Sequence, residues 1–273
     1  MIELRHIYKT YKIKKQRRII LRDIDYKFEP GVNIGILGRN GAGKSTMIRL
    51  IGGEEAPDSG QIIRGSRVSW PIGFGGCFHG QLTGRENLRF VSRIYGVPIK
   101  KVTGFVEDFS ELGDYMDMPV NTYSSGMKAK LSFGLSMALE FDYYLIDEVT
   151  AVGDASFKAK SQAIFDERRS SATLLVVSHS VSTIKRYCDK ALVLDEGQLL
   201  PFDEIDEAVA YYEAKCQGPI VYHFAEETLP KKAASAQIQA STGATSRTDY
   251  GDLPAASAGQ GLASPPDQIA AGG

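Results

Sequence analysis

A nine-residue stretch rich in glycine constrains the fold of this chain more than any other feature. It reads Gly-Arg-Asn-Gly-Ala-Gly-Lys-Ser-Thr at positions 38–46, between an apolar run at 32–37 and a helix-like stretch at 47–51. Glycine allows backbone conformations that other residues avoid, so consecutive N–H groups can turn inward toward an anion. A helix that begins near Lys44 brings its positive end to the same point. The pattern predicts an α/β fold with a site for the phosphates of a nucleoside triphosphate; a chance glycine turn is the alternative.

The side chains of this stretch have distinct expected roles. Lys44 can reach the β- and γ-phosphates and so take part in catalysis, and the Ser45 hydroxyl can ligate Mg²⁺. The whole stretch is expected to contact the nucleotide: Gly38, Arg39, Asn40, Gly41, Ala42, Gly43, Lys44, Ser45 and Thr46.

Two later apolar runs, at 143–146 and 173–177, each end in polar residues. Such runs, alternating with helical patterns, indicate a parallel sheet covered by helices, in which ligands collect at the carboxyl ends of the strands. Asp147 can hold Mg²⁺ directly or through water, and Glu148 can orient and deprotonate the attacking water. His179 can bond the γ-phosphate or position that water. Without the glycine stretch, the acids read as surface carboxylates and the histidine as a structural hydrogen-bonding group.

Other segments predict hairpins and helices around this sheet. Residues 2–7 and 19–28 alternate apolar and polar residues as antiparallel strands do. The basic run from Lys12 to Arg18 between them is interpreted as a solvated hairpin tip. Residues 191–200 predict a second hairpin, which turns at Glu196 and Gly197.

Residues from about 80 to 140 are rich in helical patterns. Thr83 and Glu86 have the spacing of a capping box before a helix that ends near Gly96. In Tyr-Ser-Ser-Gly-Met-Lys at 123–128, Ser125 is the expected N-cap of a long helix and Gly126 permits close approach of a ligand. That helix start would offer more N–H donors to phosphate; an ordinary capped helix is the alternative.

The composition limits which partners and which cellular compartment fit this chain. The 273 residues include 32 Lys or Arg and 33 Asp or Glu, and this net charge of −1 lacks the basic surplus of a general nucleic-acid-binding protein. Cys77, Cys188 and Cys216 are widely and irregularly spaced, which fits inert thiols in a reducing compartment. No apolar run reaches the length of a transmembrane helix, and the N-terminus does not resemble a signal peptide, so attachment to a membrane would need another chain.

The chain changes character near its C-terminus. From about residue 233 to Gly273, most residues are Ala, Gly, Ser or Pro, and aromatic residues almost vanish. Such a segment buries too little apolar surface to offset chain entropy, so we expect a disordered tail; a tail that contacts a partner is the alternative.

Taken in this order, the motifs resemble the ATPase subunit of an ATP-binding-cassette (ABC) transporter over residues 1–217. The resemblance identifies the glycine stretch as the Walker A loop, 143–148 as the Walker B strand and His179 as the switch histidine. Residues 123–128 stand at the place of the Leu-Ser-Gly-Gly-Gln signature. The D-loop position, 151–154, adds Asp154 to the nucleotide-binding residues. Tyr11 lies at the usual distance for the aromatic ring that stacks on adenine, with Tyr8 as a competitor.

For the fold, the resemblance implies a P-loop NTPase of the ABC ATPase type. It would have a mixed sheet core, an antiparallel β subdomain and a helical subdomain at about 80–140. Residues 218–273 would form a C-terminal extension, largely disordered from about 233.

Two departures from the family pattern stand out. Met127 and Lys128 occupy places where Gly and Gln are usual, and His79 fills the glutamine position of the Q-loop, with Gln81 two places late. A neutral imidazole nitrogen could accept a hydrogen bond from a metal-bound water, so His79 is a candidate metal contact through water. These departures bear on the rate of hydrolysis more than on nucleotide binding. A nucleotide-binding regulator with little catalysis is therefore an alternative.

Within the family, four segments resemble exporters of polysaccharides, and most closely the capsular type of Gram-negative bacteria: 69–74, 82–87, 123–127 and 133–138. Exporters of O-antigen are an alternative, although they often carry a folded C-terminal sugar-binding domain for which this tail is too short. A soluble ABC ATPase of DNA repair or translation is a further alternative. The single cassette, the absence of long heptads and the net charge of −1 argue against it.

The resemblance also implies cofactors and partners. ATP and Mg²⁺ would bind between 38–46 of one copy and Ser125-Gly126 of a second copy in a head-to-tail dimer. A polytopic membrane permease would be a separate chain, a lipid-linked polysaccharide an indirect partner, and nucleic acid no partner. The protein would lie in the cytoplasm, peripheral on the inner face of the cell inner membrane.

Overall fold

The computed structural model describes residues 1–72, 78–147, 155–218 and 223–225. All of them belong to one compact unit, Met1–Ala233. The second unit, Ala234–Gly273, contains most of the tail predicted to be disordered, and it lies outside the described residues.

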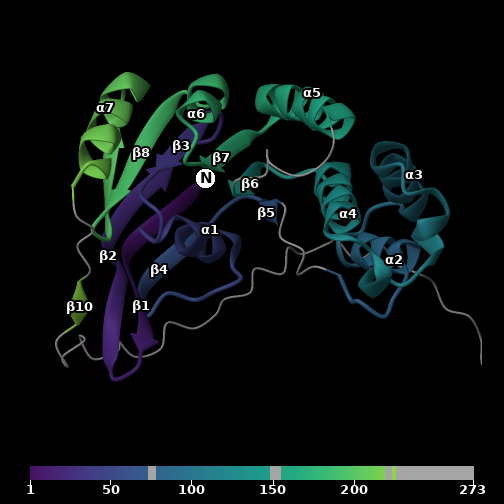
Figure 1. Cartoon of the computed structure of the whole chain (residues 1–273), viewed down its shortest axis with the longest axis horizontal. Coiled ribbons are helices and arrows are strands. Elements are labelled where there is room, and N and C mark those ends of the chain that lie inside the picture. The colour runs from purple at the N-terminus through teal and green to yellow at the C-terminus, as the bar shows by residue number, and fades with distance from the viewer. Residues whose placement is uncertain (73–77, 148–154, 219–222, 226–273) are drawn as a thin grey trace, which may run out of the picture. The chain divides into compact units, whose positions relative to one another are not determined.

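A six-stranded mixed sheet forms the centre of the first unit (Figure 1). Its first five strands are parallel and the last pairs antiparallel, in the order β5 (Val68–Ile72), β6 (Tyr143–Asp147), β7 (Thr173–Val177), β3 (Ile34–Leu37), β8 (Lys190–Asp195) and β9 (Gln198–Phe202). Every residue of β3 and β7 is buried, as expected for strands covered on both faces. The mixed sheet and the hairpin turn at Glu196-Gly197 confirm the sequence-based prediction.

A second sheet is antiparallel and contains the N-terminal hairpin. Its order is β10 (Phe224–Ala225), β2 (Gln16–Phe28), β1 (Ile2–Ile13) and β4 (Ser59–Arg64). The predicted basic hairpin tip is shorter than expected, because β1 and β2 pair as far as Ile13 and Gln16. Lys14 takes a left-handed backbone, φ 56°, which lets two residues close the turn. Arg17 and Arg18 are therefore strand residues.

Helices and short turns occupy residues 84–138 (Figure 1): α2 (Gly84–Ile94), α3 (Ile99–Ser110), 3₁₀ turns at Gly113–Asp117 and Val120–Thr122, and α4 (Ser125–Ala138). The predicted capping box is present. The Glu86 backbone N–H donates to Thr83 Oγ1 at 3.1 Å, and the Thr83 N–H donates to Glu86 Oε2 at 2.9 Å. These two bonds satisfy donors that a helix start would otherwise leave open.

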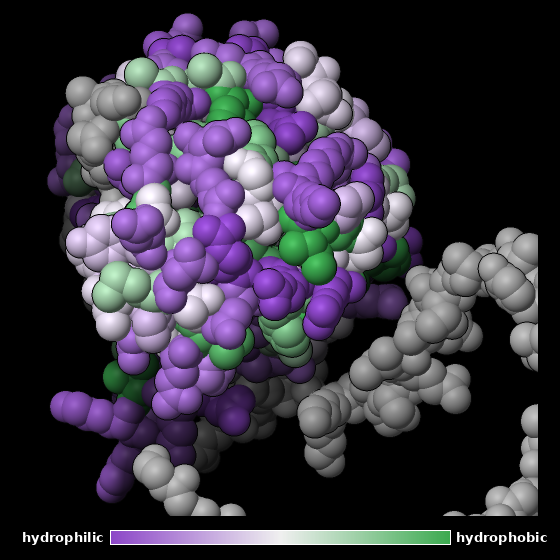
Figure 2. All heavy atoms as spheres, turned by 90° about the vertical axis from the view of Figure 1, so that its right-hand side faces the viewer, coloured by the Kyte–Doolittle hydropathy of each residue, from purple (hydrophilic) through white to green (hydrophobic). Residues whose placement is uncertain are grey.

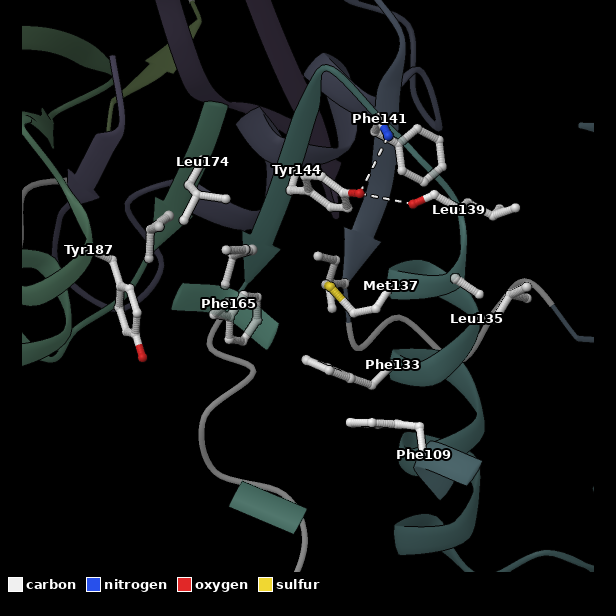
Figure 3. Close-up of a cluster of buried hydrophobic side chains, with 14 of the residues drawn as sticks. Phe109, Phe133, Leu135, Met137, Leu139, Phe141, Tyr144, Phe165, Leu174 and Tyr187 are labelled. Carbon is white, nitrogen blue, oxygen red and sulfur yellow. Dashed lines mark hydrogen bonds between the residues drawn. The ribbon is translucent and has the colours of Figure 1, made fainter. Parts of the chain in front are cut away.

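An aromatic cluster joins this helical part to the sheet (Figure 3). The ring of Phe133 on α4 lies 5.2 Å from the rings of both Phe109 and Phe165, measured between centroids. The Tyr144 hydroxyl on β6 donates to the Leu139 carbonyl at 2.9 Å, just after α4. Buried aromatic pairs stabilise by about 1 kcal/mol beyond the area they bury, so these ring contacts hold α4 against Phe109 on α3 and against Phe165, while the Tyr144 hydrogen bond links its end to β6.

The remaining helices are α1 (Lys44–Gly52), α5 (Ala155–Ser171), α6 (Val181–Tyr187) and α7 (Ile205–Cys216). In the part of the chain that is described, no helix combines the length and apolar character that crossing a bilayer requires.

Of the two cysteine thiols that the structure describes, Cys188 agrees with the inert role. Cys188 is buried, and burial raises the pKa of its thiol to about 12, so it stays protonated at neutral pH. Cys216 is exposed and unbridged, and Cys77 lies outside the described residues.

Candidate nucleotide-binding site

The glycine stretch forms the predicted loop between β3 and α1. Gly41 and Gly43 have φ of 80° and 109°, a region that side chains disfavour. A Cβ at Gly43 would also lie 2.6 Å from Ile20 Cγ2, so glycine is required there for space as well as for conformation. The Gly43 carbonyl accepts the first helical bond, from Met47 N–H at 2.9 Å. The loop thus leads directly into the positive end of α1.

Lys44 is buried within this loop, with 7% of its surface exposed. Its Nζ donates to the Gly38 carbonyl at 2.6 Å and the Arg39 carbonyl at 3.2 Å. A cavity of about 350 Å³ opens beside it, lined by Arg18, Ile20, Asn40, Gly41, Gly43, Lys44, Ser45 and Thr46. The structure therefore brings six of the nine predicted loop residues to one cavity wall.

The strand register places the other predicted groups along the same edge of the sheet. Asp147 at the end of β6 is level with Val177 on β7, which is level with Ile36 on β3. The loop at 38–46 follows β3 at this level, and exposed His179 follows β7 by two residues. Parallel strands thus carry Asp147, His179 and the loop to one carboxyl edge, where such sheets bind ligands. Glu148 and Asp154 lie outside the described residues.

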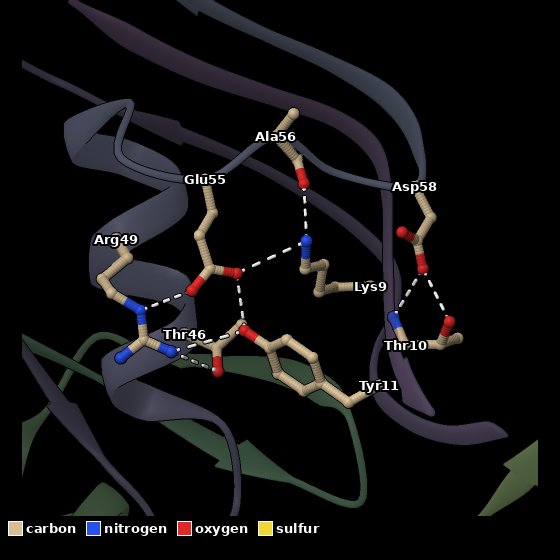
Figure 4. A network of polar contacts seen from close by, with 8 residues as sticks. All are labelled: Lys9, Thr10, Tyr11, Thr46, Arg49, Glu55, Ala56 and Asp58. Carbon is tan, nitrogen blue, oxygen red and sulfur yellow. Dashed lines mark hydrogen bonds and ion pairs between the residues drawn. The ribbon is translucent and has the colours of Figure 1, made fainter. Parts of the chain in front are cut away.

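Tyr11, the candidate for adenine stacking, belongs to a polar network beside α1 (Figure 4). Its hydroxyl donates to Glu55 Oε2 at 2.5 Å, and Arg49 Nε donates to Glu55 Oε1 at 2.6 Å. Burial raises the pKa of Glu55, but the hydrogen bonds from Tyr11 and Arg49 outweigh it and leave the pKa below its usual value. Arg49 also donates to Thr46 Oγ1 at 3.4 Å, so the network ties the last loop residue to β1.

The side chain of Arg39 points to the C-terminal helix. Its Nη1 donates to the Gly218 carbonyl at 2.6 Å and to the Lys215 carbonyl at 3.2 Å. These carbonyls lie at the negative end of α7, where a cation is favourable. Because the guanidinium is used there, any phosphate contact of Arg39 is expected from its backbone.

The N-cap of α4 is Ser124, and the sequence-based choice of Ser125 is wrong. Ser124 has an extended backbone, φ −63° and ψ 163°, and its side chain accepts from Met127 N–H at 3.2 Å. Ser125 is already the first helical residue, and it is exposed. Two adjacent serines both fit the capping pattern, and only the backbone conformation separates them. Ser125 and Gly126 still lie at the helix start, as predicted.

Replacing Ser124 by Ala is expected to lower the free energy of unfolding by about 1 kcal/mol, because the Met127 N–H loses its acceptor. Ser125→Ala is the matched control and should change stability far less. Urea unfolding followed by circular dichroism measures both. Equal effects of the two substitutions would contradict the assignment of the cap.

His79 lies in the turn before α2, with its side chain exposed. Its backbone is held by Asn87: the His79 N–H donates to Asn87 Oδ1 at 2.9 Å, and Asn87 Nδ2 donates to the His79 carbonyl at 3.1 Å. Asn87 is itself almost completely buried on α2, so it is a structural anchor that the motif search did not identify. The position of the His79 backbone is therefore tied to α2.

Sequence reasoning also missed Arg18 as a residue of the site. Its Nη2 donates to the Gly41 carbonyl at 2.9 Å, and its side chain lines the cavity beside Lys44. The available signal was the two-residue alternation along β2, which places Arg18 on the same face as Ile20. The interpretation of the whole basic run as a solvated hairpin tip left Arg18 out of the predicted site.

Comparisons with known proteins agree with this geometry. Residues 21–151 match the ABC transporter family. A capsule polysaccharide export ATP-binding protein of Neisseria meningitidis is 52% identical over 214 residues, which are 78% of this chain and 99% of that protein. A polysialic acid transport ATP-binding protein of Escherichia coli is 50% identical over 216 residues, again 78% of this chain and 99% of the relative.

A solved structure shares the fold. It is a dimeric ATP-binding cassette in a post-hydrolysis state bound to ADP and Pi. The TM-score is 0.62 at 20% identity, and the match covers 73% of this chain and 96% of the other.

Proposed function

This chain belongs to the ABC transporter family and is an ATP-binding ATPase of it, and from this premise we propose that it drives export of a capsular polysaccharide across the inner membrane. The observation that carries the ATP-driven part of the proposal is the meeting of the buried Lys44 loop with the ends of β6 and β7 at one edge of the sheet. Positioning and charge neutralisation, which this edge can supply, are what phosphoryl transfer mainly requires.

The proposed roles of the site residues follow from that edge. Lys44 and the N–H groups of 38–46 bind the phosphates, and Ser45 with Asp147 holds Mg²⁺. Glu148 deprotonates the attacking water, and His179 positions it near the γ-phosphate. The ring of Tyr11 stacks on adenine, with its hydroxyl held by Glu55.

A second copy completes the site in this proposal. The start of α4, at Ser125 and Gly126, and the D-loop residue Asp154 face the nucleotide of the opposite copy in a head-to-tail dimer. The dimeric state of the matched cassette supports such an arrangement. ATP then favours the closed dimer and hydrolysis the open one, a shift in population between two states.

The outward face of α2 supports contact with a separate membrane permease. Phe90 and Ile94 lie one turn apart on this helix and are 58% and 62% exposed. Apolar areas on this side of the molecule stand among hydrophilic side chains (Figure 2). Exposed apolar side chains flanked by charge are typical of protein interfaces. Through the permease, the protein would lie on the cytoplasmic face of the inner membrane.

Capsular polysaccharide is the preferred cargo because two relatives matched over 99% of their own length are named for capsule polysaccharide export and for polysialic acid transport. An O-antigen exporter is the second candidate.

The test of this proposal uses the full-length protein co-expressed with the membrane protein encoded beside it. We expect the two to co-purify and the complex to hydrolyse ATP, and a host that lacks its own exporter ATPase to regain surface polysaccharide. A chain that binds no permease and hydrolyses ATP only with DNA or ribosomes would overturn the transport assignment. Restoration of O-antigen but not capsule would select the second candidate.

His79 provides a prediction within the same complex. If its imidazole bonds a metal-bound water and links the nucleotide to α2, His79→Ala should lower permease-stimulated ATPase activity about tenfold while ATP affinity changes little. His79→Gln should restore part of the activity, since an amide can also accept that bond. Normal ATPase activity and normal export by the alanine variant would exclude the role.

A further inference from the structure

Arg18 is placed where a second cation can meet the nucleotide. It lines the same cavity as Lys44, and none of the described residues that line this cavity is acidic. Its Nη2 donates to the Gly41 carbonyl at 2.9 Å, so its guanidinium is held against the loop. A polyanion that enters the cavity therefore meets two positive charges, one from the loop and one from β2.

The main chain of Arg18 is fixed on both sides. It pairs with Tyr11 on β1 and with Phe224 on β10, and the next residue, Ile19, donates its N–H to the His223 carbonyl at 2.9 Å. Strand β10 belongs to the C-terminal extension, beyond the residues that resemble the family. A strand held by two neighbours presents its side chains at a defined place, which lowers the entropic cost of using them for binding.

Arg17, the neighbour of Arg18 in the sequence, lies in a different environment because side chains alternate between the two faces of a strand. Arg17 pairs with Lys12 and Ala225, and its side chain is exposed, whereas Arg18 is half-buried against the loop. Successive residues of a strand point to opposite faces, so two identical side chains take different environments. Arg17 is thus a matched control of equal charge and size on the same strand.

The geometry points to Arg18 as a further nucleotide-binding residue, which binds the β- and γ-phosphates of ATP together with Lys44. This inference rests on the proposed function, since it concerns the same nucleotide. A guanidinium carries five N–H donors in a planar fork, so a bond to the Gly41 carbonyl is compatible with bonds to phosphate oxygens. The hydrogen bond also couples the position of the loop to the position of the bound phosphate.

The experiment compares Arg18→Ala, Arg18→Lys and Arg17→Ala in the full-length protein. A fluorescent ATP analogue is bound and then displaced by ATP, ADP or AMP at low and moderate salt. We expect Arg18→Ala to weaken the binding of ATP and ADP about tenfold and to change the binding of AMP little. The substitution should also reduce the salt dependence of ATP binding. Arg18→Lys should recover part of the affinity, and Arg17→Ala should match the wild-type protein.

Each other outcome has a distinct meaning. If the wild-type protein binds no ATP, the proposed function fails and Arg18 with it. If the wild-type protein binds ATP and Arg18→Ala behaves as Arg17→Ala does, only the inference on Arg18 is overturned. Equal losses for Arg18→Ala and Arg18→Lys, for AMP as much as ATP, together with a lower unfolding midpoint, would show a structural role and overturn it as well.

Discussion

Replacing Glu148 by Gln is expected to lower the ATPase rate by about 10³-fold while ATP affinity stays near the wild-type value. The glutamate follows the end of β6, next to Asp147, and is the proposed base for the attacking water. An amide keeps the size of the side chain but cannot accept the proton, and loss of a general base removes about two to four powers of ten in rate. Binding depends on the loop and Mg²⁺, which the substitution leaves in place.

A second expected effect of this variant is a stable ATP-bound dimer, since the step that opens it is blocked. Phosphate release measures turnover, and light scattering with and without ATP measures the mass of the assembly. Glu140→Gln is the control, because Glu140 is exposed and forms an ion pair with Lys101, away from the loop at 38–46. Turnover that persists in Glu148→Gln would show that another group removes the proton.

Replacing Lys44 by Ala is expected to weaken ATP binding by about 10- to 100-fold. The change removes a buried ammonium from the loop and leaves the Gly38 and Arg39 carbonyls without its hydrogen bonds. Hydrogen bonds between charged groups contribute about 1.5–3 kcal/mol, and each 1.4 kcal/mol is about a factor of ten in affinity.

Equilibrium binding of labelled ATP checks this expectation, with Lys101→Ala as a control for the loss of one exposed lysine. The unfolding midpoints of both variants show whether the chain stays folded. An unchanged ATP affinity in folded Lys44→Ala would contradict the assignment of this loop to the phosphates. A larger loss than that of Arg18→Ala is also expected, because Lys44 is the more deeply buried of the two.

Local signals were enough to predict most of the elements. The runs that became β6 and β7 are short, apolar and bounded by polar residues. A strand buried on both faces needs apolar residues at nearly every position, so this pattern can be recognised without knowing which elements pack against it. The capping box at Thr83 and Glu86 is equally local, since its two hydrogen bonds join residues three apart. The same holds for the loop at 38–46, because its glycines specify its backbone conformation.

Local signals failed where two neighbouring residues satisfy the same pattern. Ser124 and Ser125 both suit a helix start, and the extended backbone at Ser124 decided between them. In the basic run at 12–18, composition indicated only solvent exposure. Pairing across the hairpin left residues 14 and 15 in the turn and placed the others on strands, where successive side chains point to opposite faces.

The sequence by itself determined the fold class, the phosphate loop and the residues that end the central strands, because each depends on conformations and periods encoded within a few neighbouring positions. Only the tertiary structure decided that Arg18 borders the cavity, that Arg39 turns to α7 and that Tyr11 is anchored on Glu55. These contacts join residues between 23 and 179 positions apart. Their geometry depends on strand register and on how helices pack against the sheets, which local patterns do not specify.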